Sequence, residues 1–107
     1  MISSKSGYRP ITVDDQRYRW VAGGNPCLGF NVIPFNGGGT TLQVEFQGVS
    51  APPHYYAYPS DEIIGVVLPS HVARAIREAL VKGWRPEERG KPFHLAVSHE
   101  DYNIPLL

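Results

Sequence analysis

Four histidines and one cysteine are the side chains best suited to bind a metal ion or to act as acid, base or nucleophile. They are Cys27, His54, His71, His94 and His99. None of them forms the close-spaced pair that is typical of a zinc site. His94 and His99 lie an odd number of residues apart, so an extended strand would place them on opposite faces. The sequence therefore predicts neither a metal site nor a bound cofactor.

The serine, glycine and lysine motifs of known enzymes are incomplete in this chain. Ser-His neighbours occur at 70–71 and within SHED at 98–101, whereas a catalytic triad is assembled from distant parts of a chain. The triple glycine at 37–39 completes neither a dinucleotide fingerprint nor a phosphate loop. RGKP at 89–92 lacks the Ser or Thr that follows the lysine of a phosphate loop. No residue is identified as catalytic, and the sequence favours a protein that is not an enzyme.

The uncharged segment 51–60, APPHYYAYPS, is the best candidate for a binding site. Tyrosine gives broad apolar contact with little rotamer entropy to lose, and proline stiffens a chain before it binds. The candidate contact residues are His54, Tyr55, Tyr56 and Tyr58. The alternative is a loop whose tyrosines pack over the open end of their own sheet. The sequence leaves both interpretations open.

Basic residues cluster between residues 74 and 91, although the formal net charge of the whole chain is zero. Arg74, Arg77 and Arg85 could form a basic stripe along and after a helix, suited to an acidic partner or to phosphate. The alternative is an ordinary solvated face, partly balanced by glutamates of the same stretch. Because nucleic-acid domains usually carry an overall basic charge, the composition disfavours nucleic acid as a partner.

Length and composition indicate one globular domain over residues 1–107. The tails 1–9 and 103–107 are expected to be disordered or loosely docked. The chain has no run of 18 apolar residues, so we expect no membrane-spanning helix. The first residues show no secretory signal and Cys27 has no cysteine partner, so we expect a reducing, cytoplasmic location.

Alternating apolar residues predict a small antiparallel sheet of four to five strands. The predicted strands are 11–13, 17–21, 28–34, 42–47 and 93–97. Tyr18 and Trp20 alternate with arginines, which gives one strand a buried aromatic face. The Asn-Gly-rich turn at 36–39 lies between two alternating runs and predicts a hairpin. The apolar run 62–68 fits either a strand or the buried approach to a helix.

A single amphipathic helix is predicted over about residues 70–83. Ser70 is a good N-cap, and Gly83 is the residue expected just beyond the last turn. The inward-facing side is expected to comprise Val72, Ala75, Ile76, Ala79 and Leu80. Packed on one face of the sheet, this helix gives a small α+β fold whose opposite face is solvated.

Three functions are compatible with these features. The leading one is a non-enzymatic protein–protein interaction domain, such as an accessory subunit, an inhibitor, an immunity-like protein or a homo-oligomer. The second is a small-molecule pocket, with or without catalysis, between the helix and the sheet rim, using His54, His71 and the tyrosines of segment 51–60. The third is nucleic-acid binding through the helix arginines. A small, neutral domain without a catalytic constellation favours the first.

Overall fold

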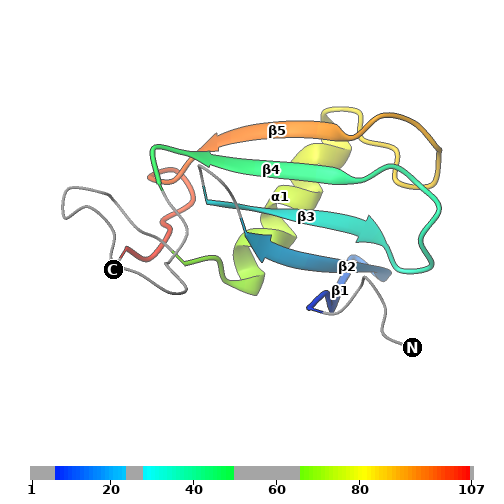
Figure 1. The fold of residues 1–107 in the computed structure, drawn as a ribbon, viewed down its shortest axis with the longest axis horizontal. Coiled ribbons are helices and arrows are strands. Elements are labelled where there is room, and N and C mark those ends of the chain that lie inside the picture. The colour runs from blue at the N-terminus through cyan, green and yellow to red at the C-terminus, as the bar shows by residue number, and fades with distance from the viewer. Residues whose placement is uncertain (1–6, 24–27, 50–65, 107) are drawn as a thin grey trace.

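Five β-strands and one α-helix make up the fold, which the computed structural model describes for residues 7–23, 28–49 and 66–106 (Figure 1). In chain order they are β1 (Arg9–Val13), β2 (Gln16–Gly23), β3 (Gly29–Pro34), β4 (Leu42–Gln47), α1 (Pro69–Val81) and β5 (Phe93–Ser98). The strands form one sheet with α1 packed against it, which confirms the predicted small α+β architecture. No helix in these ranges is long and apolar enough to cross a membrane.

The strands lie side by side in chain order, from β1 at one edge of the sheet to β5 at the other (Figure 1). β1 to β4 form an antiparallel meander. β5 runs parallel to β4, so the sheet is mixed but mostly antiparallel, and this one pair departs from the predicted antiparallel arrangement. The chain between β4 and β5 contains α1, and a crossover through a helix returns the next strand in the same direction.

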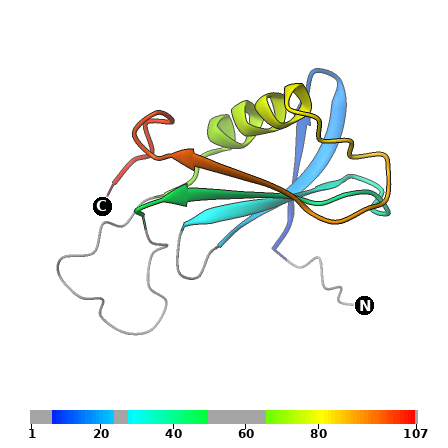
Figure 2. The ribbon, with the colours of Figure 1, turned by 90° about the horizontal axis from the view of Figure 1, so that it is seen from above.

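The hydrophobic core lies between α1 and the face of the sheet that α1 covers (Figure 2). The predicted alternation in β2 is confirmed, because Tyr18 and Trp20 are buried and Arg17 is exposed. The other strands contribute Val13, Phe30, Val32, Leu42, Val44, Phe46, Leu95 and Val97, and α1 contributes Val72, Ala75, Ile76 and Ala79. Burial of this apolar surface is the main force that holds helix and sheet together.

The helix begins one residue earlier than predicted, and its N-cap is Leu68 rather than Ser70. Pro69 occupies the first helical position, where its missing N–H costs nothing and its fixed φ suits the helix. Instead of a serine oxygen, the Nδ1 atom of His71 accepts a hydrogen bond of 2.9 Å from the Leu68 amide. Residues 66–68, the described part of the apolar run, form no strand and lead into the helix.

The helix ends at Val81, about two residues earlier than predicted, but Gly83 lies just beyond its last turn as expected. Gly83 has a φ of 114°, and its amide bonds to the Leu80 carbonyl, while the Trp84 amide bonds to the Ala79 carbonyl. These two bonds satisfy the last carbonyls in a Schellman motif. Trp84 is 1% exposed and donates its indole N–H to the Thr40 carbonyl at 3.0 Å. Leu80, predicted to face the core, is instead 38% exposed, because it lies at the end of the helix beside a groove.

Two hairpins, a tight one between β1 and β2 and a longer one between β3 and β4, shape the end of the sheet opposite the start of α1. The β1–β2 turn places Asp14 and Asp15 at φ values of 52° and 68°, as a two-residue type I′ turn requires. Residues other than Gly are uncommon at such angles, and Asp is one of the few that are enriched there. The predicted β3–β4 hairpin is confirmed, and Gly37 and Gly38 supply its positive φ values of 74° and 82°.

Candidate binding surfaces

The segment 51–60 lies outside the described ranges. This applies to all four candidate residues in it, His54, Tyr55, Tyr56 and Tyr58. Their contact with a partner therefore stays a prediction, as does the alternative that they pack on their own domain.

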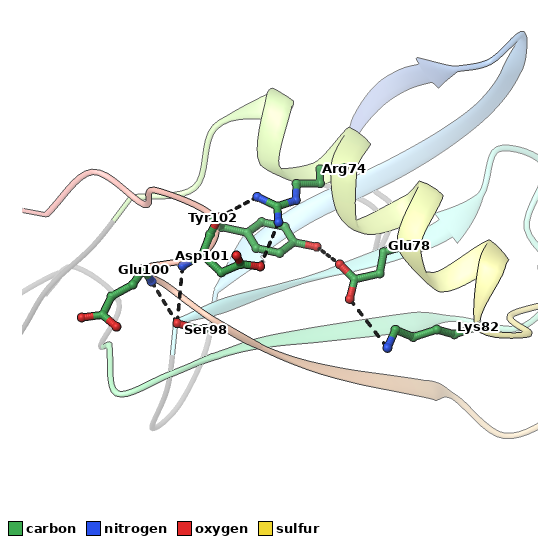
Figure 3. Close-up of polar contacts among 7 residues, drawn as sticks. All are labelled: Arg74, Glu78, Lys82, Ser98, Glu100, Asp101 and Tyr102. Atoms are coloured by element: carbon green, nitrogen blue, oxygen red, sulfur yellow. Dashed lines mark hydrogen bonds and ion pairs between the residues drawn. The ribbon is translucent and has the colours of Figure 1, made fainter.

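Arg74 of α1 holds the turn that follows β5. Its guanidinium donates hydrogen bonds to the Asp101 carbonyl at 2.7 Å and to Asp101 Oδ2 at 2.8 Å (Figure 3). The same group lies 4.0 Å from the centroid of the Tyr102 ring, within the range of a cation–π contact. Arg74 therefore holds the turn after β5 against α1, and a phosphate could bind Arg74 only in competition with Asp101.

Tyr102 strengthens this attachment from the other side. Its hydroxyl donates a hydrogen bond of 2.7 Å to Glu78 Oε1, and Lys82 lies 3.9 Å from the other carboxylate oxygen (Figure 3). Burial, together with the hydrogen bond to Glu78 and its negative charge, raises the pKa of Tyr102 far above its ordinary value. The hydroxyl therefore stays protonated and keeps donating throughout the physiological range.

The other two candidate arginines differ from one another. Arg77 bonds to both carboxylate oxygens of Asp14 at 3.1 and 3.4 Å, which joins α1 to the β1–β2 turn. Both partners are more than half exposed, so the pair contributes little stability. Arg85 is exposed in the loop after the helix and has no ion pair with any described residue. Two of the three candidate arginines, Arg74 and Arg77, therefore already have an acidic partner in the chain, and their binding of a further partner stays a prediction.

His71 is a structural residue of the helix start. It is 7% exposed, and its Nδ1 atom can accept from Leu68 only in the neutral form. Burial lowers the pKa of His71, hydrogen bonding to the backbone of Asn103 opposes this shift, and the charge of Arg74 adds to it. The neutral imidazole is thus the form that the fold stabilises.

A groove of about 840 Å³ opens where the β1–β2 and β3–β4 turns approach the C-terminal end of α1. Its lining comprises Asp15, Gln16, Arg17, Tyr18, Pro34, Phe35, Asn36, Gly37, Gly38, Gly39, Leu80, Pro86 and Glu87. The lining therefore mixes both signs of charge with apolar surface. Burial, followed by the charges of Asp14 and Glu87, raises the pKa of Tyr18. His71, which the small-molecule hypothesis expected at such a pocket, does not line the groove.

The sheet face away from α1 carries a pair of arginines that sequence reasoning did not select as site residues. The guanidinium carbons of Arg17 and Arg19 lie 3.8 and 4.2 Å from the centroid of the Phe35 ring. Arg19 Nε also donates to the Phe35 carbonyl at 3.1 Å. Neither arginine forms an ion pair within the described part of the chain. These two cations are therefore better placed than the helix arginines to meet an acidic group.

The β5 edge presents hydrogen-bonding groups that no described strand uses. The Phe93 amide donates to the Thr41 carbonyl of the β4 side at 2.8 Å. Because backbone groups alternate along a strand, the amides of residues 95 and 97 also point to β4. Those of His94, Ala96 and Ser98 point away from the sheet, and all three residues are exposed.

The β1 edge is different. The two-residue turn makes Val13 and Gln16 a hydrogen-bonded pair, so the outward positions of β1 are Pro10 and Thr12. Proline has no N–H, and proline on an edge strand is a common protection against unwanted pairing. One edge of the sheet is therefore blocked and the other is open among the described elements.

Sequence reasoning missed the β5 edge and the groove for physical reasons. Alternation in 93–97 identifies a strand and its inner face, but it does not tell which strand lies beside it. The order strand, helix, strand over β4, α1 and β5 was the sequence signal that could have revealed this neighbour, because a connection through a helix usually joins two parallel strands. The groove depends on the close approach of Gly39 to Pro86, far apart in the chain.

The chain matches no protein-family model, and neither a curated protein nor a solved structure shows significant similarity to it.

Proposed function

We propose that this protein is a cytoplasmic, non-enzymatic protein-binding domain that accepts an extended segment of its partner as an additional strand beside β5. The observation that carries the proposal is the β5 edge, which no described strand or helix covers. Its six residues contain no proline, glycine, lysine or other charged residue that would discourage pairing. Strand addition at such an edge is a recurrent mode of peptide recognition.

The geometry of β5 gives both affinity and specificity to such a complex. His94 and Ala96 each offer an amide and a carbonyl, and each new backbone hydrogen bond contributes about 0.5–1.5 kcal/mol. Phe93 is only partly buried beside the core. A partner strand with apolar residues at alternate positions would place them beside Phe93, on the sheet face that α1 covers. It would thereby extend the apolar layer between helix and sheet. The open face would tolerate small polar residues.

The test compares two variants of one outward residue. Ala96→Pro removes an amide that points away from β4, whereas Ala96→Val keeps this amide and suits a strand. Each variant and the wild type serve as bait in cell extract, with circular dichroism to verify the fold and mass spectrometry to quantify the bound proteins. We expect a partner that wild type and Ala96→Val retain and folded Ala96→Pro loses. Equal capture by all three baits would contradict strand addition.

The segment 51–60 is tested in the same capture. Changing Tyr55 and Tyr56 to Ala weakens retention of that partner if the tyrosines contact it, and leaves retention unchanged if they do not. This variant therefore separates the two interpretations of the segment without affecting the test of β5.

Small-molecule binding is a second candidate because the groove falls within the usual size of ligand sites. A screen of metabolites for increased melting temperature would find its ligand. Leu80→Glu places a charge in the groove, and Val81→Glu is the matched control because Val81 is 87% exposed and does not line the groove. We expect a groove ligand to stabilise Val81→Glu and not Leu80→Glu. Equal stabilisation of both variants would place the ligand elsewhere.

A further inference from the structure

We infer that the strand accepted by β5 is β5 of a second copy of this chain, antiparallel to it and related by a two-fold axis at Leu95. This inference rests on the proposed function, because it uses the same edge and names its occupant. The two five-stranded sheets would join into one continuous sheet with a helix from each copy on the same face.

The backbone groups of the edge match one another in this register. His94 faces Ala96 of the second copy, and the two residues exchange both of their N–H···O bonds. Ser98 faces Pro92 of the second copy. Pro92 has no amide to leave unpaired, and the Ser98 carbonyl already accepts the Tyr102 amide at 3.3 Å. The Ser98 amide and the Pro92 carbonyl are the groups that remain, and they form a donor–acceptor pair.

The apolar side chains of the edge are also complementary. Leu95 meets Leu95 of the second copy at the axis, where a non-hydrogen-bonded pair brings side chains closest. Phe93 meets Val97 of the second copy on the same face. Of the three inward-facing residues of β5, Phe93, Leu95 and Val97, only Phe93 is partly exposed within one chain. Pairing would therefore bury the apolar side chain that a single chain leaves most exposed.

Charge selects the antiparallel direction. β5 itself carries no formal charge, but Arg89 and Lys91 precede it and Glu100 and Asp101 follow it. Antiparallel pairing brings Lys91 of each copy near Glu100 of the other, whereas parallel pairing would bring like charges together. The Glu100 amide bonds to Ser98 Oγ at 3.1 Å, which fixes Glu100 beside the end of the strand. Glu100 forms no ion pair with any described residue, while Asp101 is bound to Arg74.

The first experiment measures molar mass by light scattering over a range of protein concentrations. We expect wild type and Ala96→Val to approach the mass of a dimer, and Ala96→Pro to keep the mass of a monomer. Hydrogen exchange followed by NMR should show the amides of His94 and Ala96 becoming protected as the wild-type dimer forms. A wild type that stays monomeric, or a dimer that folded Ala96→Pro does not disrupt, would overturn the inference.

Charge reversal gives a second test that does not depend on proline being tolerated. Lys91→Glu and Glu100→Lys each place like charges at both ends of the paired strands, and each should raise the dimer dissociation constant about tenfold at low salt. The double variant Lys91→Glu with Glu100→Lys restores opposite charges and should restore the wild-type constant. Equal constants for all four proteins, or additive weakening in the double variant, would overturn antiparallel self-pairing.

Failure of this inference is distinguishable from failure of the proposed function. A monomeric wild type whose captured partner is lost on Ala96→Pro would contradict self-pairing and support strand addition by another protein. Absence of both a dimer and an Ala96-dependent partner would contradict both.

Discussion

β1 and β5 are the two edge strands of the sheet, and different residues occupy their outward backbone positions. At β1 the outward backbone positions are held by Pro10 and Thr12, and at β5 they are held by His94, Ala96 and Ser98. Proline removes half of the donors from the first edge, whereas the second edge keeps all of its own. Exposed edges are a general hazard of β-sheet proteins, and among the described residues one edge carries a proline while the other carries none. This difference is the basis of the proposal that the β5 edge binds a partner strand.

The largest expected effect distinguishes the inward and outward residues of β5. Leu95→Pro removes a ladder amide and a buried leucine, and should lower the free energy of unfolding by about 4 kcal/mol or more. Its neighbour Ala96→Pro should cost about 1 kcal/mol or less, because the Ala96 amide points away from β4. Urea denaturation measures both. Similar losses for the two variants would show that the assignment of outward groups is wrong.

The next effect concerns the start of α1, the helix in the connection between β4 and β5. The folded state lowers the pKa of His71, so its contribution to stability is fully present above the unfolded pKa of about 6.5 and is lost as the pH falls below it. His71→Ala should cost about 1–2 kcal/mol at pH 7.5. It should also reduce the loss of stability between pH 7 and 5.

Denaturation of wild type and His71→Ala at both pH values measures this difference. His99→Ala is a suitable control, because His99 is only partly buried and lies outside the helix. An unchanged pH dependence in His71→Ala would mean that another group is responsible.

A smaller effect is expected in the turn that presents β1. Asp15 has a φ of 68° at the second position of a type I′ turn, where glycine is preferred. Asp15→Gly should therefore raise the free energy of unfolding by about 0.5–1 kcal/mol. Asp14 is kept, because it pairs with Arg77. The dissociation constant of the proposed dimer should not change, since the turn is remote from β5. A change in this constant would weaken the comparison between the two edges.

The smallest effect on stability comes from removing the protection of β1. Pro10→Ala should lower the free energy of unfolding by less than about 1 kcal/mol, mainly through a more flexible unfolded chain. It also gives β1 a second outward amide, and we expect association beyond the dimer at high concentration, seen by light scattering. If this variant associates no more than wild type, Pro10 is not what protects the β1 edge.

Local patterns predicted most of this fold, because they reflect local physics. The two-residue period placed Tyr18 and Trp20 in the core, and the helical period together with Gly83 predicted α1 to within two residues of its ends. The N-cap was wrong because Pro69 outcompetes Ser70 for the start of the helix. The parallel pairing of β5 with β4 was not predicted, because alternation contains no information on neighbouring strands.

The candidate sites were less accessible to the same reasoning. The sequence suggested that Arg74 and Arg77 had no acidic partner in the chain, because Asp101 and Asp14, with which they pair, are distant in sequence. The alternation in β2 predicted that Arg17 and Arg19 face outward. It could not predict that Phe35, which directly follows β3, contacts both of them. The segment 51–60 remains a candidate from its composition alone.

The long crossover before β5 also sets the order in which the sheet is completed. Short connections join β1 to β4, so these strands can pair early, whereas β5 reaches β4 only after residues 48–92 have been synthesised. During that interval β4 is the outer strand of a four-stranded sheet. Nascent chains that lie close together on one messenger could then exchange their last strands, and each would complete the sheet of its neighbour. Slow elongation through the crossover would favour such exchange, and rapid folding of α1 would oppose it.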